Sequence, residues 1–198
     1  MTPRVVLLDS GGANLGSVQA AFARLGVEAP VTADADSIRA ATHVVLPGVG
    51  AARATMARLR QNGLDLLVPT LEKPLLGICV GMQVMHERSE EGDTTCLALL
   101  PGAIRRLRGG EGTRVPHMGW NRLRMTTRHP LLDGLDDAWM YFVHGYAAGV
   151  GGQTLASCEH GGLFTAVAGS GRRFGVQFHP ERSGAAGARL LMNFLALR

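Results

Sequence analysis

Aromatic side chains are scarce in this sequence, making up 5% of its 198 residues. None of them interleaves with the arginines that give most of the net charge of +4, as a base-stacking nucleic-acid surface would need. We therefore expect no nucleic-acid binding and interpret the arginines as solvated faces of strands and loops, with contact to an acidic protein partner as the alternative. The arginines in question are Arg105, Arg106, Arg108, Arg114, Arg122 and Arg124.

Cysteine is also rare, and long apolar runs are missing. The three cysteines are an odd number without the spacing of a disulfide framework, which is typical of a reducing compartment. The first apolar stretch, Val5–Leu8, is interrupted by Asp9 and is too short for a signal peptide. No run approaches the ~18–20 apolar residues of a membrane helix. These absences predict a cytoplasmic protein that makes no membrane contact.

The chain lacks complete motifs for binding a phosphate or a metal. Gly11 and Gly16 have the spacing of a P-loop, but position 17 is Ser instead of Lys, so a structural turn is favoured over nucleotide binding. His86 and Glu87 begin a zincin-like string whose second histidine is missing, because position 90 is Glu. No other spacing of Cys and His suggests a metal. We expect no cofactor and no metal.

What the sequence does contain is a thiol in a glycine-flanked turn, followed much later by an imidazole and a carboxylate two residues apart. Cys79 lies between Gly77 and Gly81, whose small size leaves room for a nucleophile on a crowded strand-to-helix turn. A lone cysteine after an apolar run is commonly a core residue. Together with His179 and Glu181, in this order, Cys79 completes the parts of a Cys-His-Glu nucleophilic triad.

The expected geometry follows from the neighbouring residues. A helix starting at Val80 would place Cys79 at its N-terminus, where the helix dipole favours thiolate and lowers the pKa of the thiol from roughly 8.5. The amide of Val80 would face a developing oxyanion. If 173–178 and the residues after it continue as a strand, His179 and Glu181 project from the same face and meet.

Hydrophobic content of 46% and charged content of 18% are typical of a globular protein, and we expect a single domain over residues 1–198. Strands and helices alternate before residue 100, which predicts an α/β fold with a mainly parallel sheet between two helical layers. After residue 100, short strands separated by Gly-rich turns predict antiparallel additions. Expected strands are 4–9, about 27–31, 43–46, 74–78, 103–107, 122–125, 139–143, 154–158, 163–168 and 173–178, and expected helices are 14–25, 51–60 and 184–197.

The motifs resemble those of a known family. Gly-Ile-Cys-Val-Gly-Met-Gln at 77–83 and His-Pro-Glu at 179–181 resemble the class I (triad) glutamine amidotransferases, whose fold is a flavodoxin-like three-layer sandwich. The resemblance narrows to the glutaminase subunits of imidazole glycerol phosphate synthases and runs from Asp9 to the C-terminal helix. It is carried by Leu-Pro-Gly-Val-Gly at 46–50, Val-Pro-His-Met-Gly-Trp-Asn at 115–121, Tyr-Phe-Val-His at 141–144 and Gln-Phe-His-Pro-Glu-Arg-Ser at 177–183.

The resemblance implies an enzyme of histidine biosynthesis. Cys79 would attack the side-chain amide of glutamine, with His179 as base and then acid and Glu181 as the group that orients the imidazole. Ammonia would pass through a channel to a (β/α)8-barrel cyclase subunit, the partner in a heterodimer, for synthesis of imidazole glycerol phosphate and aminoimidazole carboxamide ribotide. A glutaminase subunit serving a different synthase, or a stand-alone γ-glutamyl hydrolase, is the alternative.

Further site residues are implied by family position. The oxyanion would be met by the amides of Val80 and of the Pro47–Gly50 loop, at Val49 or Gly50. Gln83 and Glu91 also have structural interpretations, as a helix-surface residue and a solvated loop residue, and Trp120 as a core anchor. Implied glutamine-binding residues are Gly48, Gln83, Glu91, Gly145 and Tyr146, and implied partner-interface residues are Trp120, Asn121, Tyr141 and Arg182.

Two positions depart from the family pattern. Ser10 follows Asp9 where a tyrosine is usual, and Gly145 stands where a serine is usual. Both lie near the expected glutamine pocket or partner interface, while the three triad residues are intact.

Overall fold

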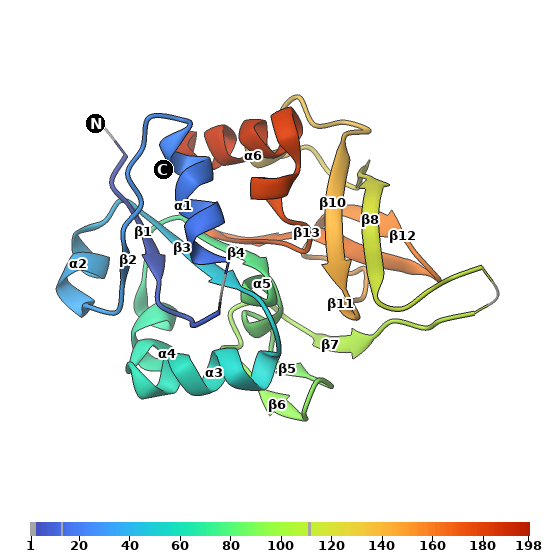
Figure 1. The fold of residues 1–198 in the computed structure, drawn as a ribbon, viewed down its shortest axis with the longest axis horizontal. Coiled ribbons are helices and arrows are strands. Elements are labelled where there is room, and N and C mark those ends of the chain that lie inside the picture. Colours follow the sequence, from blue (N-terminus) through green and yellow to red (C-terminus); the bar gives the residue numbers. More distant parts are fainter. Residues whose placement is uncertain (1–2, 13, 111) are drawn as a thin grey trace.

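An eight-stranded mixed sheet forms the centre of the molecule (Figure 1). The computed structural model describes residues 3–12, 14–110 and 112–198. Five strands in the order β2-β1-β3-β4-β14 are parallel, and the sheet continues antiparallel through β13, β12 and β9. The parallel part has the flavodoxin-like order 2-1-3-4-5, with β14 in the fifth place. The expected α/β fold with antiparallel additions is confirmed.

The central parallel strands β1, β3 and β4 are mainly apolar and buried on both faces, as a helix-covered sheet requires, while the edge strand β2 is only partly buried. The bounds of the five parallel strands are β1 Val5–Leu8, β2 Val31–Thr32, β3 His43–Gly48, β4 Leu75–Cys79 and β14 Arg173–Val176. The antiparallel extension consists of β13 Leu163–Ser170, β12 Thr154–Glu159 and β9 Arg124–Met125. These strands fall within or close to the ranges that the apolar runs predict.

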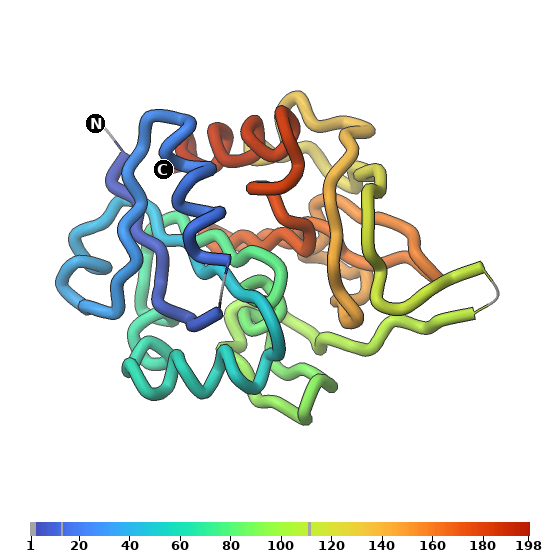
Figure 2. The backbone as a smooth tube through the Cα atoms, viewed as in Figure 1, coloured from blue at the N-terminus to red at the C-terminus, as the bar shows by residue number. Residues whose placement is uncertain are grey.

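Helices cover both faces of the sheet. In Figure 1, α1 Leu15–Ala23 and α6 Gly184–Ala196 lie above it, and α3 Ala52–Gln61, α4 Leu64–Leu67 and α5 Val80–Val84 lie below. Figure 2 shows the blue α1 segment beside the red segment of η3 Pro180–Arg182 and α6, and contacts join α1 to η3. The remaining helical turns are α2 Ala35–Ala40, η1 Val68–Thr70 and η2 Pro130–Leu132.

Two smaller sheets flank the main one. β8 His117–Arg122 and β10 Trp139–His144 form an antiparallel pair, and β11 Tyr146–Ala148, β7 Ala103–Arg106, β5 Arg88–Ser89 and β6 Thr94–Thr95 form the other sheet. Strand β8 is not among the expected strands. Because β10 runs directly on through Gly145 to β11, the chain between these sheets passes along one wall of the site described below.

One expectation about local structure is wrong. Strand β14 ends at Val176, and Pro180 begins the short helix η3, so His179 and Glu181 do not lie on a strand. Proline has no N–H for a sheet hydrogen bond and fits the first turn of a helix, which explains the change at this point. The side chains of His179 and Glu181 are nevertheless in contact, because the turn of η3 brings them together.

The core is apolar and continuous across the sheet. Phe22 of α1, Phe142 of β10, Phe178 and Phe194 of α6 are its largest fully buried side chains. On α6, Leu190 and Leu191 are buried with Phe194, as the 3–4-residue spacing predicts, while Leu195 is partly buried. Within the described ranges, no helix is long and apolar enough to span a bilayer.

Candidate active site

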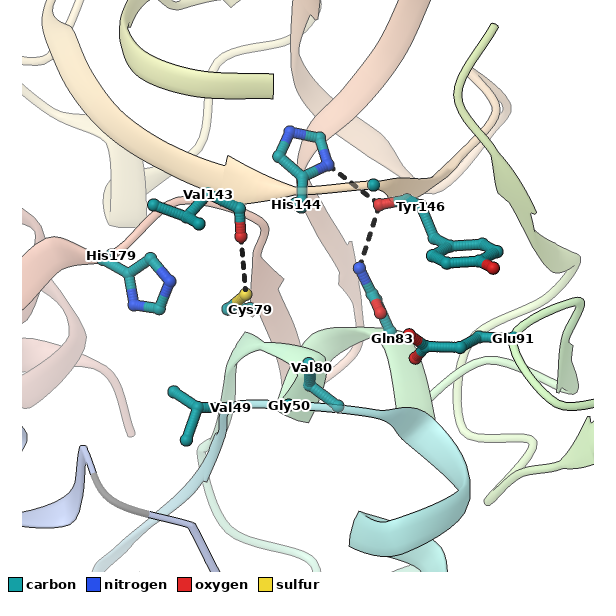
Figure 3. A pocket seen from close by; sticks show the side chains of 11 residues that line it. Val49, Gly50, Cys79, Val80, Gln83, Glu91, Val143, His144, Tyr146 and His179 are labelled. Atoms are coloured by element: carbon teal, nitrogen blue, oxygen red, sulfur yellow. Dashed lines mark hydrogen bonds between the residues drawn. The ribbon is translucent and has the colours of Figure 1, made fainter. Parts of the chain in front are cut away.

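Most of the expected catalytic, oxyanion and glutamine-binding residues gather around one cavity at the carboxyl ends of β3 and β4, shown in Figure 3. Ligands of parallel α/β sheets bind at this edge, outside the carboxyl ends of the strands. The cavity is lined by Val49, Gly50, Cys79, Val80, Gln83, Glu91, Val143, His144, Gly145, Tyr146 and His179. Residues from distant parts of the chain, β3, β4, β10 and the segment after β14, therefore share one small space.

Cys79 occupies the sharp turn between β4 and α5. Its φ of 53° and ψ of −112° are an unusual backbone conformation for a residue with a side chain, and such strain collects at functional sites. A Cβ at Gly81 would lie 1.8 Å from Leu46 O, and one at Gly77 would lie 2.6 Å from the Met85 sulfur. The turn is thus closed by direct backbone packing, which confirms that it needs small neighbours.

The thiol of Cys79 faces two polar groups across the cavity. Its Sγ lies 3.8 Å from Val143 O of β10 (Figure 3), and the side-chain amide of Gln177 donates to it at 3.7 Å. Only 4% of Cys79 is exposed, so a substrate reaches the sulfur through the cavity alone. Gln177 and Val143 are contacts that the motif search does not identify, although Gln177 stands only two residues before His179.

His179 and Glu181 form a buried pair. His179 Nδ1 lies 2.7 Å from Glu181 Oε1, and the exposed fractions of the two side chains are 7% and 0%. The backbone of His179 is fixed by a bond from its N–H to Tyr141 O at 2.9 Å and by Ser183 Oγ donating to its carbonyl at 2.7 Å. With Nδ1 bound to the carboxylate, the other ring nitrogen is left for the cavity.

The electrostatic environment of His179 favours its charged form. Burial alone would lower the pKa of this imidazole, but hydrogen bonding and charge attraction to Cys79 and Glu181 outweigh burial and raise the pKa from 6.5 to about 10. The raised pKa means that, at neutral pH, an imidazolium is stabilised between a sulfur and a carboxylate. A charged imidazole beside a sulfur is an arrangement that suits a cysteine nucleophile.

The loop after β3 forms the floor of the cavity beside Cys79. Val49, Gly50 and Val80 all line the cavity, and all three lie below Cys79 in Figure 3. Gly48 pairs with Cys79 in the sheet and packs against the start of α5, because a Cβ there would lie 2.5 Å from Gly81 N. Gly48 is therefore beside the site without being among the residues that line the cavity.

Ser10 connects this loop to the first strand. Its hydroxyl is buried and donates to Pro47 O at 2.5 Å. A Cβ at Gly12 would lie 2.6 Å from the Val49 side chain, so the segment after β1 packs closely on the loop after β3. The residue that departs from the family pattern thus has a definite contact in this chain.

Four implied glutamine-binding residues line the far end of the cavity. Gln83 donates to Tyr146 O at 2.9 Å and to Gln177 Oε1 at 3.0 Å, and only 2% of it is exposed, so it is not a helix-surface residue. Glu91 accepts from the Ala52 amide at 2.7 Å, at the start of α3. Gly145 and Tyr146 also line the cavity, and Figure 3 shows Tyr146 across from Gln83 and Glu91.

A histidine pair contacts the backbone of Tyr146. His144 Nδ1 lies 2.8 Å from Tyr146 O, and its Nε2 lies 3.1 Å from His117 Nδ1. Burial lowers the pKa of His117 to about 4 and that of His144 to about 3, so both rings are neutral at pH 7. Neither histidine is a predicted site residue, and a lone histidine within a strand gives no signal of such a partner.

The implied interface residues come from the neighbouring elements β8, β10 and η3. Trp120 and Tyr141 are cross-strand neighbours on β8 and β10, with ring centroids 5.8 Å apart, and Trp120 is 52% exposed, so it is not a core anchor. Arg182 is exposed beside a hollow that Val49, Val143 and His179 also line. Asn121 points to the opposite face of β8 from Trp120 and donates to Glu159 O at 2.9 Å.

Nothing in the described ranges suggests a metal centre, since no group of three or more His, Cys, Asp or Glu side chains is placed to hold an ion. The other two thiols do not line this cavity, and burial outweighs the attraction of Arg60 to Cys96 and of Arg124 to Cys158. Burial raises the pKa of Cys96 to about 11 and that of Cys158 to about 12. A nucleophile with a base, a carboxylate behind the base and backbone amides beside it can perform acyl transfer on a small amide or ester.

The amino-acid sequence is similar to those of known proteins over nearly its whole length. Over 194 residues, 98% of this chain and 97% of the relative, it is 57% identical to the imidazole glycerol phosphate synthase subunit HisH of Xanthomonas oryzae pv. oryzae (strain MAFF 311018). It is 53% identical, with the same coverage, to the HisH subunit of Xylella fastidiosa (strain 9a5c).

Solved structures share the fold at low sequence identity. A crystal structure of a glutamine amidotransferase superposes with a TM-score of 0.75 at 21% identity, covering 97% of each chain. The structure of PurLQS from Thermotoga maritima gives a TM-score of 0.70 at 18% identity, covering 99% of each chain. Residues 6–197 match the family described as Glutamine amidotransferase class-I, and the chain belongs to that family.

Proposed function

We propose that the chain hydrolyses glutamine to glutamate and ammonia with Cys79, His179 and Glu181 as its triad. The observation that carries this proposal is the His179 Nδ1 to Glu181 Oε1 contact of 2.7 Å behind a cavity that His179 shares with Cys79. The carboxylate orients the ring so that Nε2 is turned to the sulfur side, and it stabilises the imidazolium. The raised pKa of His179 favours a charged imidazole beside the Cys79 sulfur before substrate arrives.

The reaction proceeds by two acyl transfers. The Cys79 thiolate attacks the amide carbon of glutamine, and the oxyanion is met by the amide of Val80 and one from Val49 or Gly50. When the C–N bond breaks, His179 gives its proton to the leaving nitrogen, and ammonia departs from a glutamyl thioester. His179 then takes a proton from water, whose oxygen attacks the thioester and releases glutamate and the thiolate.

The glutamine itself would lie between Gln83, Glu91 and the Gly145–Tyr146 wall. The Glu91 carboxylate suits the substrate's α-ammonium, and the neighbouring amide and backbone groups suit its α-carboxylate. Both ends of the amino acid would then be recognised by charge and hydrogen bonds, which distinguishes glutamine from a simple amide. The substrate's side-chain amide would reach toward Cys79.

The ammonia has a proposed acceptor, a (β/α)8-barrel cyclase subunit of an imidazole glycerol phosphate synthase. The curated relatives that are 53–57% identical are named as HisH subunits of that synthase. The half-exposed Trp120 beside Tyr141 offers an aromatic surface of the kind that anchors protein interfaces. Direct transfer keeps ammonia unprotonated, whereas in neutral water it becomes ammonium, which has no lone pair for attack.

The experiment uses the chain together with that cyclase and its nucleotide substrate. Cys79→Ala is expected to abolish glutamine-dependent synthesis while synthesis from added ammonia remains, because the cyclase keeps its own site. Cys96→Ala is the matched control, a thiol outside the cavity, and is expected to retain both activities. If Cys79→Ala also abolishes ammonia-dependent synthesis, or if the chain alone hydrolyses glutamine at full rate and gains nothing from the cyclase, the proposal is wrong. The second outcome would favour a stand-alone hydrolase or a different synthase.

A further inference from the structure

Asn14 stands at the N-cap of α1 but does not cap the helix. An N-cap asparagine normally accepts from the amides of the first turn with its side-chain oxygen, which stabilises a helix by about 1 kcal/mol. Here the side chain makes no cap hydrogen bond. A favoured capping residue is therefore turned to another partner, at a cost to its own helix.

That partner is the carboxylate behind the histidine. Asn14 Nδ2 lies 2.5 Å from Glu181 Oε1, and because a carboxylate only accepts, the amide nitrogen is the donor. The same oxygen accepts from His179 Nδ1 at 2.7 Å. The second oxygen, Oε2, is buried without a partner among the described residues. Oε1 thus carries both bonds of a side chain that is completely buried.

We propose that Asn14 is a positioning residue of the triad: it holds Glu181 Oε1 toward His179 Nδ1, and it does so instead of capping α1. This inference rests on the proposed glutaminase function. Without Asn14, the Glu181 carboxylate would keep only the hydrogen bond from His179 and could rotate to present Oε2 instead. Asn14 therefore restricts the carboxylate to one orientation, which in turn orients the His179 ring. Asn14 touches neither the substrate nor the thiol, and its effect on the reaction passes through Glu181.

The location of Asn14 couples the triad to the loop beneath Cys79. Ser10 and Gly12, in the same segment after β1, contact Pro47 and Val49. Asn14 also lines the hollow that Arg182, Val49, Val143 and His179 share. The segment between β1 and α1 therefore touches the oxyanion loop with one end and the triad carboxylate with the other, and a displacement of this segment would misalign both.

Substitutions at this position separate capping from positioning. Asn14→Ser provides a good helix cap but is too short to reach Glu181, and Asn14→Asp keeps the shape and the cap but replaces the donor by a second carboxylate. Ala20→Ser, at an exposed position of the same helix outside the hollow that Asn14 lines, is the matched control. In the complex with the cyclase, we expect kcat for glutamine hydrolysis to fall about tenfold to a hundredfold in Asn14→Ser, as for loss of a hydrogen bond to a charged group. We expect a larger fall in Asn14→Asp.

The substrate affinity and the fold are expected to be spared. KM for glutamine stays within about twofold, because Asn14 does not line the glutamine cavity. The unfolding midpoint of Asn14→Ser stays close to that of the wild type, because the new cap of about 1 kcal/mol offsets much of the lost hydrogen bond. If Asn14→Ser keeps full kcat, a cap alone suffices and the inference is overturned. If kcat and the unfolding midpoint fall together in Asn14→Ser, the role is structural and the inference is also overturned.

A spectroscopic readout does not depend on glutamine hydrolysis. In the wild-type complex, the imidazole of His179 can be titrated by NMR after histidine labelling, and Asn14→Ser is expected to lower its pKa by about one unit as the carboxylate loosens. An unchanged pKa overturns the inference. If the wild-type complex shows no glutamine hydrolysis while this pKa still shifts, the proposed function fails and the positioning role of Asn14 stands.

Discussion

His117 Nδ1 lies 3.1 Å from His144 Nε2, and this contact fixes the protons of both rings. His144 Nδ1 faces Tyr146 O, which only accepts, so Nδ1 carries the proton of the neutral ring and Nε2 accepts. His117 Nδ1 must then be a donor. The result is a one-directional path of hydrogen bonds from β8, beside the exposed Trp120, to the carbonyl that Gln83 also contacts.

The His117–His144 pair makes the folded protein less stable at acidic pH. In the unfolded chain, histidine takes up a proton near 6.5, whereas burial delays this in the folded state to about 4 for His117 and about 3 for His144. Lowering the pH from 7 to 5 therefore protonates the unfolded state preferentially, and each histidine costs about 1–2 kcal/mol of unfolding free energy. His179, whose pKa is raised, contributes in the opposite sense, with stability present below 6.5 and lost as the pH rises toward about 10.

Urea unfolding at pH 7 and at pH 5 measures this dependence. His117→Gln keeps a polar side chain but cannot titrate, so its loss of stability between the two values is expected to be smaller than the wild type's by about 1–2 kcal/mol. Because both proteins share all other titrating groups, His144 among them, the difference isolates His117. Equal losses in the two proteins would mean that His117 takes up its proton as readily in the folded state as in the unfolded state.

Glu181→Gln tests the charge behind His179. Removing the negative charge is expected to lower the pKa of His179, because attraction to Glu181 helps to raise it. The thiolate–imidazolium pair then weakens, so alkylation of Cys79 by iodoacetamide at pH 6–7 slows. Glutamine turnover is expected to fall about a thousandfold, less than in Cys79→Ala, because the nucleophile remains. An alkylation rate equal to that of the wild type contradicts this account.

The sequence predicts the central strands β1, β3 and β4 well because they are mainly apolar and buried on both faces. Strand β8 escapes prediction for the opposite reason: its apolar Met118 and Trp120 point outward, while His117 points into the protein, so the usual pattern is reversed. In our proposal, this outward apolar face of β8 binds the cyclase subunit. Residues joined only by tertiary contact, such as Asn14 and Glu181, carry no spacing signal at all, since 167 positions separate them.

Adding a side chain should affect stability very differently at two glycines beside the site. A Cβ at Gly145 would meet nothing closer than Val115 Cγ1 at 3.9 Å, whereas one at Gly81 would lie 1.8 Å from Leu46 O. Gly145→Ser, the usual residue of the family, is therefore expected to change stability by no more than about 0.5 kcal/mol, and Gly81→Ala to cost about 3 kcal/mol or more. Thermal unfolding compares them, and a destabilised Gly145→Ser would show that this wall has less room than the structure gives it.

Trp120 is expected to anchor the cyclase. It is half exposed, packs edge-on against Tyr141 and has the size and rigidity of an interface hot spot. Trp120→Ala is expected to weaken the complex by about 2 kcal/mol, or roughly thirtyfold in Kd, when titrated by calorimetry. Leu66→Ala is the control, because Leu66 is 77% exposed on α4, on the side of the molecule away from β8 (Figure 1). Since both substitutions remove an exposed apolar side chain, equal Kd values in the two variants would place the cyclase on a different surface.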